Sequence, residues 1–156
     1  MNTLQYTTTF KNTNMKSLRY MHDGDSGIDL QANITQDVTF TIHGRSRRLV
    51  PTGISVDLTP LASSFTTYEL QIRSRSGLAH KEGIIVLNAA GTVDSNYTGE
   101  IYVNIYNTTD NNYIINAGDR IAQAVIAPVH IIIPKEVTSF DTITSRGANG
   151  HGSTGK

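Results

Sequence analysis

Asp94 and Tyr97 are the side chains of this sequence whose type and setting point most directly to chemistry. They lie in a turn-rich stretch, NAAGTVDSNYTGEIYVNIYN, that runs from Asn88 to Asn107. Glycine, Asn and Asp tolerate positive φ or fold onto the local backbone, so this turn is wide and exposes its backbone groups. Such a turn can present N–H and C=O groups to a flat polar ligand such as a nucleobase. We interpret the stretch as a catalytic β-hairpin; the alternative from the residues alone is a turn-forming Asp94 and a surface Tyr97.

Two strands are expected to hold this turn. On the C-terminal side, Ile101, Val103 and Ile105 alternate with polar and tyrosine residues, which is the two-residue period of a half-buried strand. On the N-terminal side, residues 84–87 read IIVL, an apolar run rich in β-branched residues.

The rest of the chain predicts an all-β domain of jelly-roll type, a double-sheet sandwich or barrel. Short β-type runs such as VTFTIHG, RRLVPTG, ISVDL and GDRIAQAVIAPVHIII are separated by Gly and Pro. The helical 3.6-residue period is missing from all longer windows, and Leu78–Glu82 allows at most a turn or two of helix.

Composition excludes several classes of function. The 156 residues suit one domain, and 13 basic residues balance 13 acidic ones, so no overall field recruits nucleic acid or an anionic membrane. With no cysteine, the chain has no disulfide, thiolate metal site or cysteine nucleophile. No apolar stretch reaches membrane-spanning length. We therefore expect a soluble intracellular protein of the cytoplasm, with the nucleus or a virus-infected cell as other settings.

The last residues differ in composition from the rest. We expect residues 1–141 to form the β domain and residues 142–156 to form a flexible tail, since the tail has four glycines in the eleven residues after Ser145. This tail is either a plain disordered end or a wrap for phosphate oxygens, built from glycine N–H groups with Arg146, Ser153 and Thr154.

Five segments, GDSGIDL, RSGLA, NAAGTVDSNYTGEI, GDRIAQ and RGANGHGSTG, resemble the trimeric deoxyuridine triphosphatase (dUTPase) family in order and spacing. The resemblance implies a jelly-roll homotrimer with three active sites at subunit boundaries. It also implies Mg²⁺-dependent hydrolysis of dUTP to dUMP and pyrophosphate, which keeps uracil out of DNA and supplies dUMP for thymidylate synthesis.

In the hairpin, the resemblance assigns Asp94 as the general base. A carboxylate with a reference pKa near ~3.9 is ionised at neutral pH and can deprotonate a water that attacks the α-phosphorus. Tyr97 is expected to lie against the deoxyribose and exclude a 2′-hydroxyl. Asn88, with backbone groups of Gly91 and Ile101, is expected to read the uracil edge.

The other four segments are expected to handle the phosphates. Asp29 matches the residue that holds the metal through water. Arg75, Ser76 and Gly77 match phosphate contacts at the start of a short helix, where Ser76 steadies the leaving pyrophosphate. Gln123 matches a further phosphate contact, so Asp94, Ser76 and Gln123 form the expected catalytic set. In the tail, Arg146 is expected to meet the γ-phosphate and His151 to stack on the uracil, within a wrap that includes Gly150, Gly152, Ser153 and Thr154.

Three residues depart from the family pattern: Ser74 replaces a proline, Thr98 an arginine and His151 a phenylalanine. Two other functions remain open. A dCTP deaminase or bifunctional deaminase of the same fold needs a glutamate base beside the pyrimidine, whereas this hairpin carries Asp94. A regulatory protein-binding role is the second.

Overall fold

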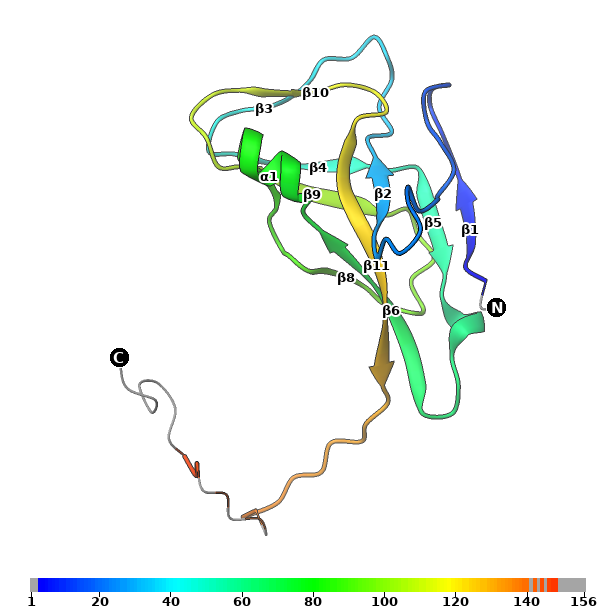
Figure 1. Ribbon diagram of the computed structural model, residues 1–156, viewed down its shortest axis with the longest axis vertical. Coiled ribbons are helices and arrows are strands. Elements are labelled where there is room, and N and C mark those ends of the chain that lie inside the picture. Colours follow the sequence, from blue (N-terminus) through cyan, green and yellow to red (C-terminus); the bar gives the residue numbers. More distant parts are fainter. Residues whose placement is uncertain (1–2, 141, 143, 145, 149–156) are drawn as a thin grey trace.

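The computed structural model describes residues 3–140, 142, 144 and 146–148. Its strands are β1 (Gln5–Thr8), β2 (Ile28–Gln31), β3 (Phe40–Ile42), β4 (Arg47–Pro51), β5 (Ile54–Asp57), β6 (Thr66–Arg73), β7 (Ile84–Val86), β8 (Gly91–Val93), β9 (Tyr102–Asn107), β10 (Tyr113–Ile115) and β11 (Arg120–His130). They form a four-stranded sheet β2-β11-β6-β8, a three-stranded sheet β4-β9-β7, and the pairs β1-β5 and β10-β3, all antiparallel (Figure 1). The predicted all-β jelly-roll class is confirmed.

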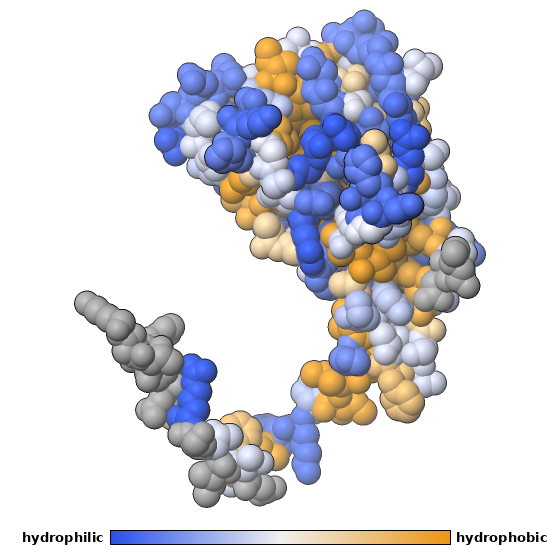
Figure 2. All heavy atoms as spheres, viewed as in Figure 1, coloured by the Kyte–Doolittle hydropathy of each residue, from blue (hydrophilic) through white to orange (hydrophobic). Residues whose placement is uncertain are grey.

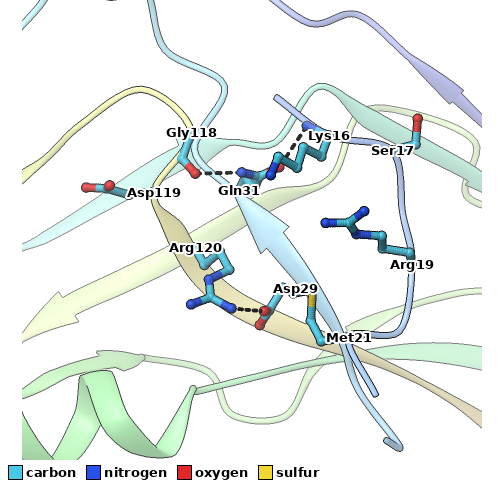
Figure 3. A pocket seen from close by; sticks show the side chains of 9 residues that line it. All are labelled: Lys16, Ser17, Arg19, Met21, Asp29, Gln31, Gly118, Asp119 and Arg120. Carbon is cyan, nitrogen blue, oxygen red and sulfur yellow. Dashed lines mark hydrogen bonds and ion pairs between the residues drawn. The ribbon is translucent and has the colours of Figure 1, made fainter. Parts of the chain in front are cut away.

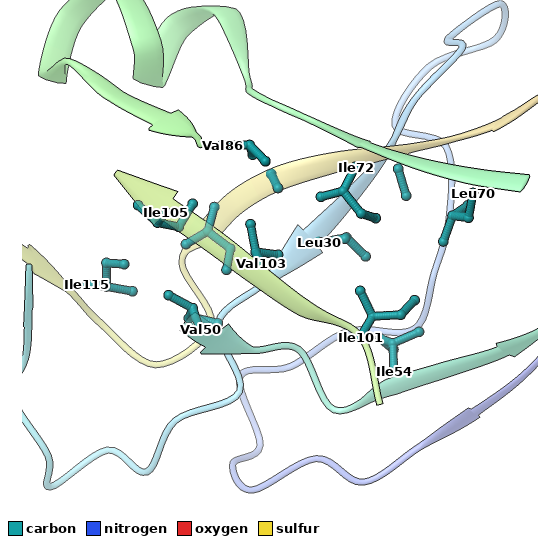
Figure 4. Packing of buried hydrophobic residues seen from close by; sticks show 14 of the residues in the cluster. Leu30, Val50, Ile54, Leu70, Ile72, Val86, Ile101, Val103, Ile105 and Ile115 are labelled. Atoms are coloured by element: carbon teal, nitrogen blue, oxygen red, sulfur yellow. The ribbon is translucent and has the colours of Figure 1, made fainter. Parts of the chain in front are cut away.

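Apolar side chains from both large sheets fill the core between them. The expected alternation in β9 holds: Val103 and Ile105 are fully buried, whereas Tyr102 between Ile101 and Val103 is 50% exposed. These side chains pack with Leu30, Leu70 and Ile72 of the four-stranded sheet (Figure 4). Full burial of each such side chain contributes about 1.5–3 kcal/mol, so this core fixes where the loops at its rim stand.

The wide turn of the expected hairpin contains a strand of its own. Strands β7 and β9 pair as predicted, but Gly91–Val93 between them form β8 and pair with Leu70–Ile72 of the other sheet. The β-branched Thr92 and Val93 suit a strand, and β6 offers them an unpaired edge. The stretch that carries Asp94 therefore crosses from one sheet to the other.

The only helices among the described residues are short. One 3₁₀ turn spans Thr59–Leu61, and α1 spans Ser76–Glu82, close to the predicted turn or two. Helix α1 ends at Gly83, whose φ of 65° is in the left-handed region that closes many helices. No helix within residues 3–140, 142, 144 and 146–148 has the length and apolar character needed to cross a membrane.

Strands β6 and β11 continue beyond the rest of their sheet. Thr66–Glu69 pair with Ala127–His130 after the partners of β2 and β8 have ended, so a two-stranded ribbon projects from the core. Residues 131–140 then lead away from the domain as an exposed arm (Figure 1). The arm starts with three exposed isoleucines, Ile131, Ile132 and Ile133, and Figure 2 shows apolar surface along this part of the chain.

Candidate active site

A carboxylate shared by two arginines forms the first part of the site. Asp29 on β2 accepts a bond from Nε of Arg75 at 2.9 Å on one oxygen and from Nη1 of Arg120 at 3.0 Å on the other. Nη1 of Arg75 also donates to the backbone oxygen of Arg120 at 2.9 Å. The Asp29 side chain is only 20% exposed, so the pairing is partly shielded from solvent. Two guanidinium groups on one carboxylate leave a positive excess suited to a phosphate chain.

Strand pairing explains why these three residues meet. Strand β2 pairs with β11, and Asp29 lies opposite Gln123, three residues after Arg120. Gln123 lies in turn opposite Arg73, near the end of β6, from which the chain passes through Arg75 into α1. The sheet therefore joins the GDSGIDL, RSGLA and GDRIAQ segments at one corner.

Gln123 and Ser74 brace this corner. Nε2 of Gln123 donates to the backbone oxygen of Ser74 at 2.9 Å, and Ser74 Oγ accepts the backbone N–H of Val86 at 2.8 Å. Ser74 thus ties the start of α1 to β7 by a hydrogen bond, where a proline has no hydroxyl to offer. A Cβ at Gly27 would collide with the Gln123 side-chain amide, so a larger residue there would displace this amide from Ser74.

Asp94, Tyr97 and Ile101 line an open depression of about 250 Å³ at the hairpin. Asp94 and Tyr97 are exposed, and the Tyr97 hydroxyl donates to the backbone oxygen of Glu100 at 2.8 Å. The Glu100 carboxylate accepts the Gly53 N–H at 2.8 Å and the Tyr102 hydroxyl at 3.2 Å, so it anchors the hairpin to the β4–β5 turn. The negative charge of Glu100 and its hydrogen bond raise the pKa of the Tyr102 hydroxyl.

The three residues expected to read a nucleobase differ in exposure and in the hydrogen bonds that they already make. Asn88 is exposed beside the buried Gly91, where an added Cβ comes within 3.1 Å of Asn88 Nδ2. The backbone groups of Ile101 already make hydrogen bonds. The Ile101 N–H donates to the backbone oxygen of Ile54 at 2.8 Å, and the Ile101 oxygen accepts the hydroxyl of Thr52 at 2.7 Å and the backbone N–H of Thr52 at 3.2 Å. Asn88, Gly91 and Ile101 stay the expected base readers, and the existing bonds of Ile101 fix the position of its backbone groups.

Asp29 and Asp94 lie at opposite edges of the same sheet. Between β2, which carries Asp29, and β8, which precedes Asp94, stand β11 and β6. Three strand spacings of roughly 4.8 Å put the two edges on the order of 14 Å apart. A single chain thus holds the arginine corner and the hairpin as two separate half-sites.

The remaining residues singled out from the sequence either adjoin these half-sites or lie in the tail. Ser76 and Gly77 are exposed at the start of α1. Thr98 is in the hairpin turn and lines a shallow depression with β1 and β5. Arg146 lies within the described residues, whereas Gly150, His151, Gly152, Ser153 and Thr154 lie outside them.

The described residues suit a metal held through water rather than by direct ligands. Within residues 3–140, 142, 144 and 146–148, no three His, Asp or Glu side chains cluster as a metal site. Each Asp29 oxygen accepts one guanidinium bond, and a carboxylate oxygen has a second lone pair for a metal-bound water. Mg²⁺ typically keeps several waters and takes its remaining ligands from substrate phosphates.

Arg120 is a candidate site residue that the structure adds to the set, because it shares Asp29 with Arg75. A signal was present, since Arg120 opens the strand whose fourth residue is Gln123. Asp119, in contrast, is a turn residue: its Oδ2 accepts the backbone and side-chain N–H groups of Asn116 at 2.8 and 3.2 Å.

Comparison with known proteins places these half-sites in context. The model of the dUTPase family matches residues 13–155. A deoxyuridine 5'-triphosphate nucleotidohydrolase of Anaplasma marginale is 47% identical over 136 residues, which cover 87% of this chain and 86% of that protein. The protein of the same name from Chlamydia muridarum is 44% identical over 137 residues, covering 88% and 89%. Among solved structures, a Staphylococcus bacteriophage 80alpha dUTPase with dUPNHPP matches with a TM-score of 0.81 and 25% identity, covering 100% of both chains.

Proposed function

The chain belongs to the dUTPase family, and on that premise we propose that it hydrolyses dUTP to dUMP and pyrophosphate. The observation that carries the proposal is the pair of half-sites, an arginine corner around Asp29 and a hairpin with Asp94 and Tyr97. The first suits a triphosphate and the second a deoxynucleoside. Relatives with 44–47% identity bear the name of this activity.

The hairpin half-site supplies the base and the sugar contact. Asp94 is exposed at the rim of the depression, where it can orient and deprotonate the water that attacks the α-phosphorus. Tyr97 is held by its bond to Glu100 and lies against the deoxyribose. Asn88 and the backbone of Gly91 and Ile101 read the uracil edge; a base with other donors and acceptors leaves these groups unpaired, which is a strong basis for rejection.

The arginine corner receives the phosphate chain. Arg75 keeps donors beyond those it gives to Asp29 and Arg120, and an arginine fork matches two phosphate oxygens at once. Ser76, Gly77 and Gln123 complete the contacts, and Ser76 steadies the leaving pyrophosphate. Asp29 holds the water shell of Mg²⁺, which when bound offsets charge on the phosphate oxygens.

We also infer that the functional unit is a homotrimer with shared sites. The two half-sites lie at opposite sheet edges, which favours a site that one chain's arginine corner forms with another chain's hairpin. The arm of residues 131–140 gives a means of contact, because Ile132 and Ile133 are 78% and 93% exposed and gain by burial against another copy. A neighbouring hairpin then faces the arginine corner.

The tail completes the site in this proposal. Residues 142–156 close over the bound nucleotide, with Arg146 at the γ-phosphate and His151, which Gly150 and Gly152 flank in the sequence, on the uracil ring. Ser153 and Thr154 add hydroxyl contacts to phosphate oxygens.

A pyrophosphate-release assay with dUTP, dTTP, dCTP and UTP tests the proposal. We expect release from dUTP well above that from the other three, and a large loss in the Asp94→Asn variant. Ammonia release from dCTP would instead identify a deaminase. Absence of turnover with all four nucleotides would favour the regulatory binding role.

A further inference from the structure

A basic hollow of about 340 Å³ lies beside the arginine corner, on the side away from Gln123. It is bounded by the segment before β2, by β2 and by the β10–β11 turn, and its lining residues are Lys16, Ser17, Arg19, Met21, Asp29, Gln31, Gly118, Asp119 and Arg120 (Figure 3). Asp29 and Arg120 belong to both the hollow and the corner, so the two spaces are continuous.

Hydrogen bonds hold the walls of the hollow in place. The Gln31 side chain accepts the backbone N–H of Lys16 at 2.9 Å and donates to the backbone oxygen of Gly118 at 2.7 Å. Gly118 has a φ of 84°, which favours glycine, and its N–H donates to Ala32 at 2.9 Å. One amide therefore joins both walls of the hollow.

The two cations that face this hollow from the segment before β2 have no acidic partner. Arg19 and Lys16 are exposed, and the ion pairs found among the described residues involve only Arg45, Arg75 and Arg120. Figure 3 shows the Arg19 guanidinium directed into the hollow, toward the side of Asp29 and Arg120.

Charge at the combined site is therefore unbalanced. Lys16, Arg19, Arg75 and Arg120 are four cations, and among the described residues three carboxylates line the hollow or the adjoining space beside Gln123: Asp25, Asp29 and Asp119. Asp29 is already shared by two arginines, and Asp119 is bonded to Asn116. An anion with several oxygens, and not a single carboxylate, matches this number of donors.

We propose that Arg19 and Lys16 bind the β- and γ-phosphates of the substrate and the pyrophosphate released from it. This inference rests on the proposed dUTP hydrolysis and adds two residues outside the five family segments. The position fits, because the hollow opens from the arginine corner that takes the phosphate chain and lies away from the sheet edge with the hairpin. The chain has no net charge, so these local cations, not an overall field, attract the polyanion.

Inorganic pyrophosphate with Mg²⁺ is the probe that tests the proposal. We expect Arg19→Ala to weaken pyrophosphate binding to the full-length protein by about 10-fold, which corresponds to ~1.4 kcal/mol, and Lys16→Ala by less. Arg19→Lys should recover part of the loss. The KM for dUTP should rise together with the dissociation constant of pyrophosphate, because dUTP carries the same two phosphate groups.

Binding of dUMP, which lacks the β- and γ-phosphates, is the internal control and should stay unchanged in all three variants. Arg47→Ala removes an exposed cation of β4, a strand of the other large sheet that does not line the hollow. It is the matched control and should change neither the affinity for pyrophosphate nor the KM for dUTP. Arg19 is exposed and unpaired among the described residues, so its loss should not affect the fold, as circular dichroism can verify.

Equal pyrophosphate affinity in parent and Arg19→Ala would overturn the inference, as would a parallel loss of dUMP binding, which indicates a structural role. Calorimetry measures these affinities without turnover. The parent's hydrolysis of dUTP is a separate readout, so failure of the proposed function is distinguishable from failure of this subsite.

Discussion

The hydroxyl of Tyr97 donates to the backbone oxygen of Glu100 at 2.8 Å, which folds the phenol ring over Gly99. A Cβ at Gly99 lies only 2.6 Å from that hydroxyl and 2.7 Å from the ring carbon bearing it. The absent side chain at residue 99 is therefore what lets the ring lie where the deoxyribose is expected.

Gly99→Ala should displace Tyr97 with little effect on stability, since the clash is with the exposed end of one side chain. We expect the ratio of dUTP to UTP hydrolysis to fall about 5- to 30-fold, or ~1–2 kcal/mol, with the melting temperature nearly unchanged. Tyr97→Ala should lower the ratio of dUTP to UTP hydrolysis in the same way. Tyr97→Phe keeps the ring and should retain most of the preference for dUTP. An unchanged ratio of dUTP to UTP hydrolysis in Gly99→Ala would mean that the position of the Tyr97 ring does not decide between the two sugars.

Asp94→Asn should keep the fold and nucleotide binding but lose turnover by ~10²–10⁴-fold, because the amide preserves size and removes the base. Single-turnover hydrolysis and binding of a non-hydrolysable dUTP analogue separate the two effects. Hydrolysis close to that of the parent would remove Asp94 from the mechanism.

Mixing two inactive variants tests whether sites are shared between chains. A chain that ends before Arg146 lacks the tail, and an Asp94→Asn chain lacks the base. If the hairpin and the tail of one site come from different chains, co-refolded mixtures should regain activity that neither variant has alone. An active monomer in sedimentation experiments contradicts this prediction.

Asp29→Asn should raise the Mg²⁺ concentration needed for half-maximal activity by ~10–100-fold, the usual effect of losing a group that holds a metal through its ligands. Chelation of Mg²⁺ should abolish turnover in the parent. The variant also leaves Arg75 and Arg120 without their shared carboxylate, so its melting temperature should fall. A Mg²⁺ titration identical to that of the parent would exclude Asp29 from the metal shell.

His151→Ala should reduce kcat/KM by ~5–30-fold, from the lower half of the ~1–3 kcal/mol typical of base stacking on an aromatic side chain. His151→Phe should match or exceed the parent. Because imidazole titrates near pH ~6.5, nucleotide affinity of the parent should show a pH step that the Phe variant lacks. Three equal affinities for parent, Ala and Phe forms mean that the ring never reaches the base.

Local patterns in the sequence were enough to predict the all-β class, the buried face of β9 and the short helix. The alternation of Ile101, Val103 and Ile105 is a property of neighbouring residues, and the pleat of a strand converts it directly into a buried face. The five segments likewise indicated the family, since their order and spacing are visible in one dimension.

Pairing between distant residues was decided only by the tertiary structure. Asp29 and Arg75 are separated by 46 residues, and their ion pair follows from the register of β2, β11 and β6, which no local pattern encodes. The same register made Arg120 a partner of Asp29, and the hydrogen bond from Lys16 to Gln31 holds the segment of Arg19 beside the adjoining hollow. It also separated Asp29 from Asp94 by the width of a sheet, because strand order depends on contacts made across the whole core.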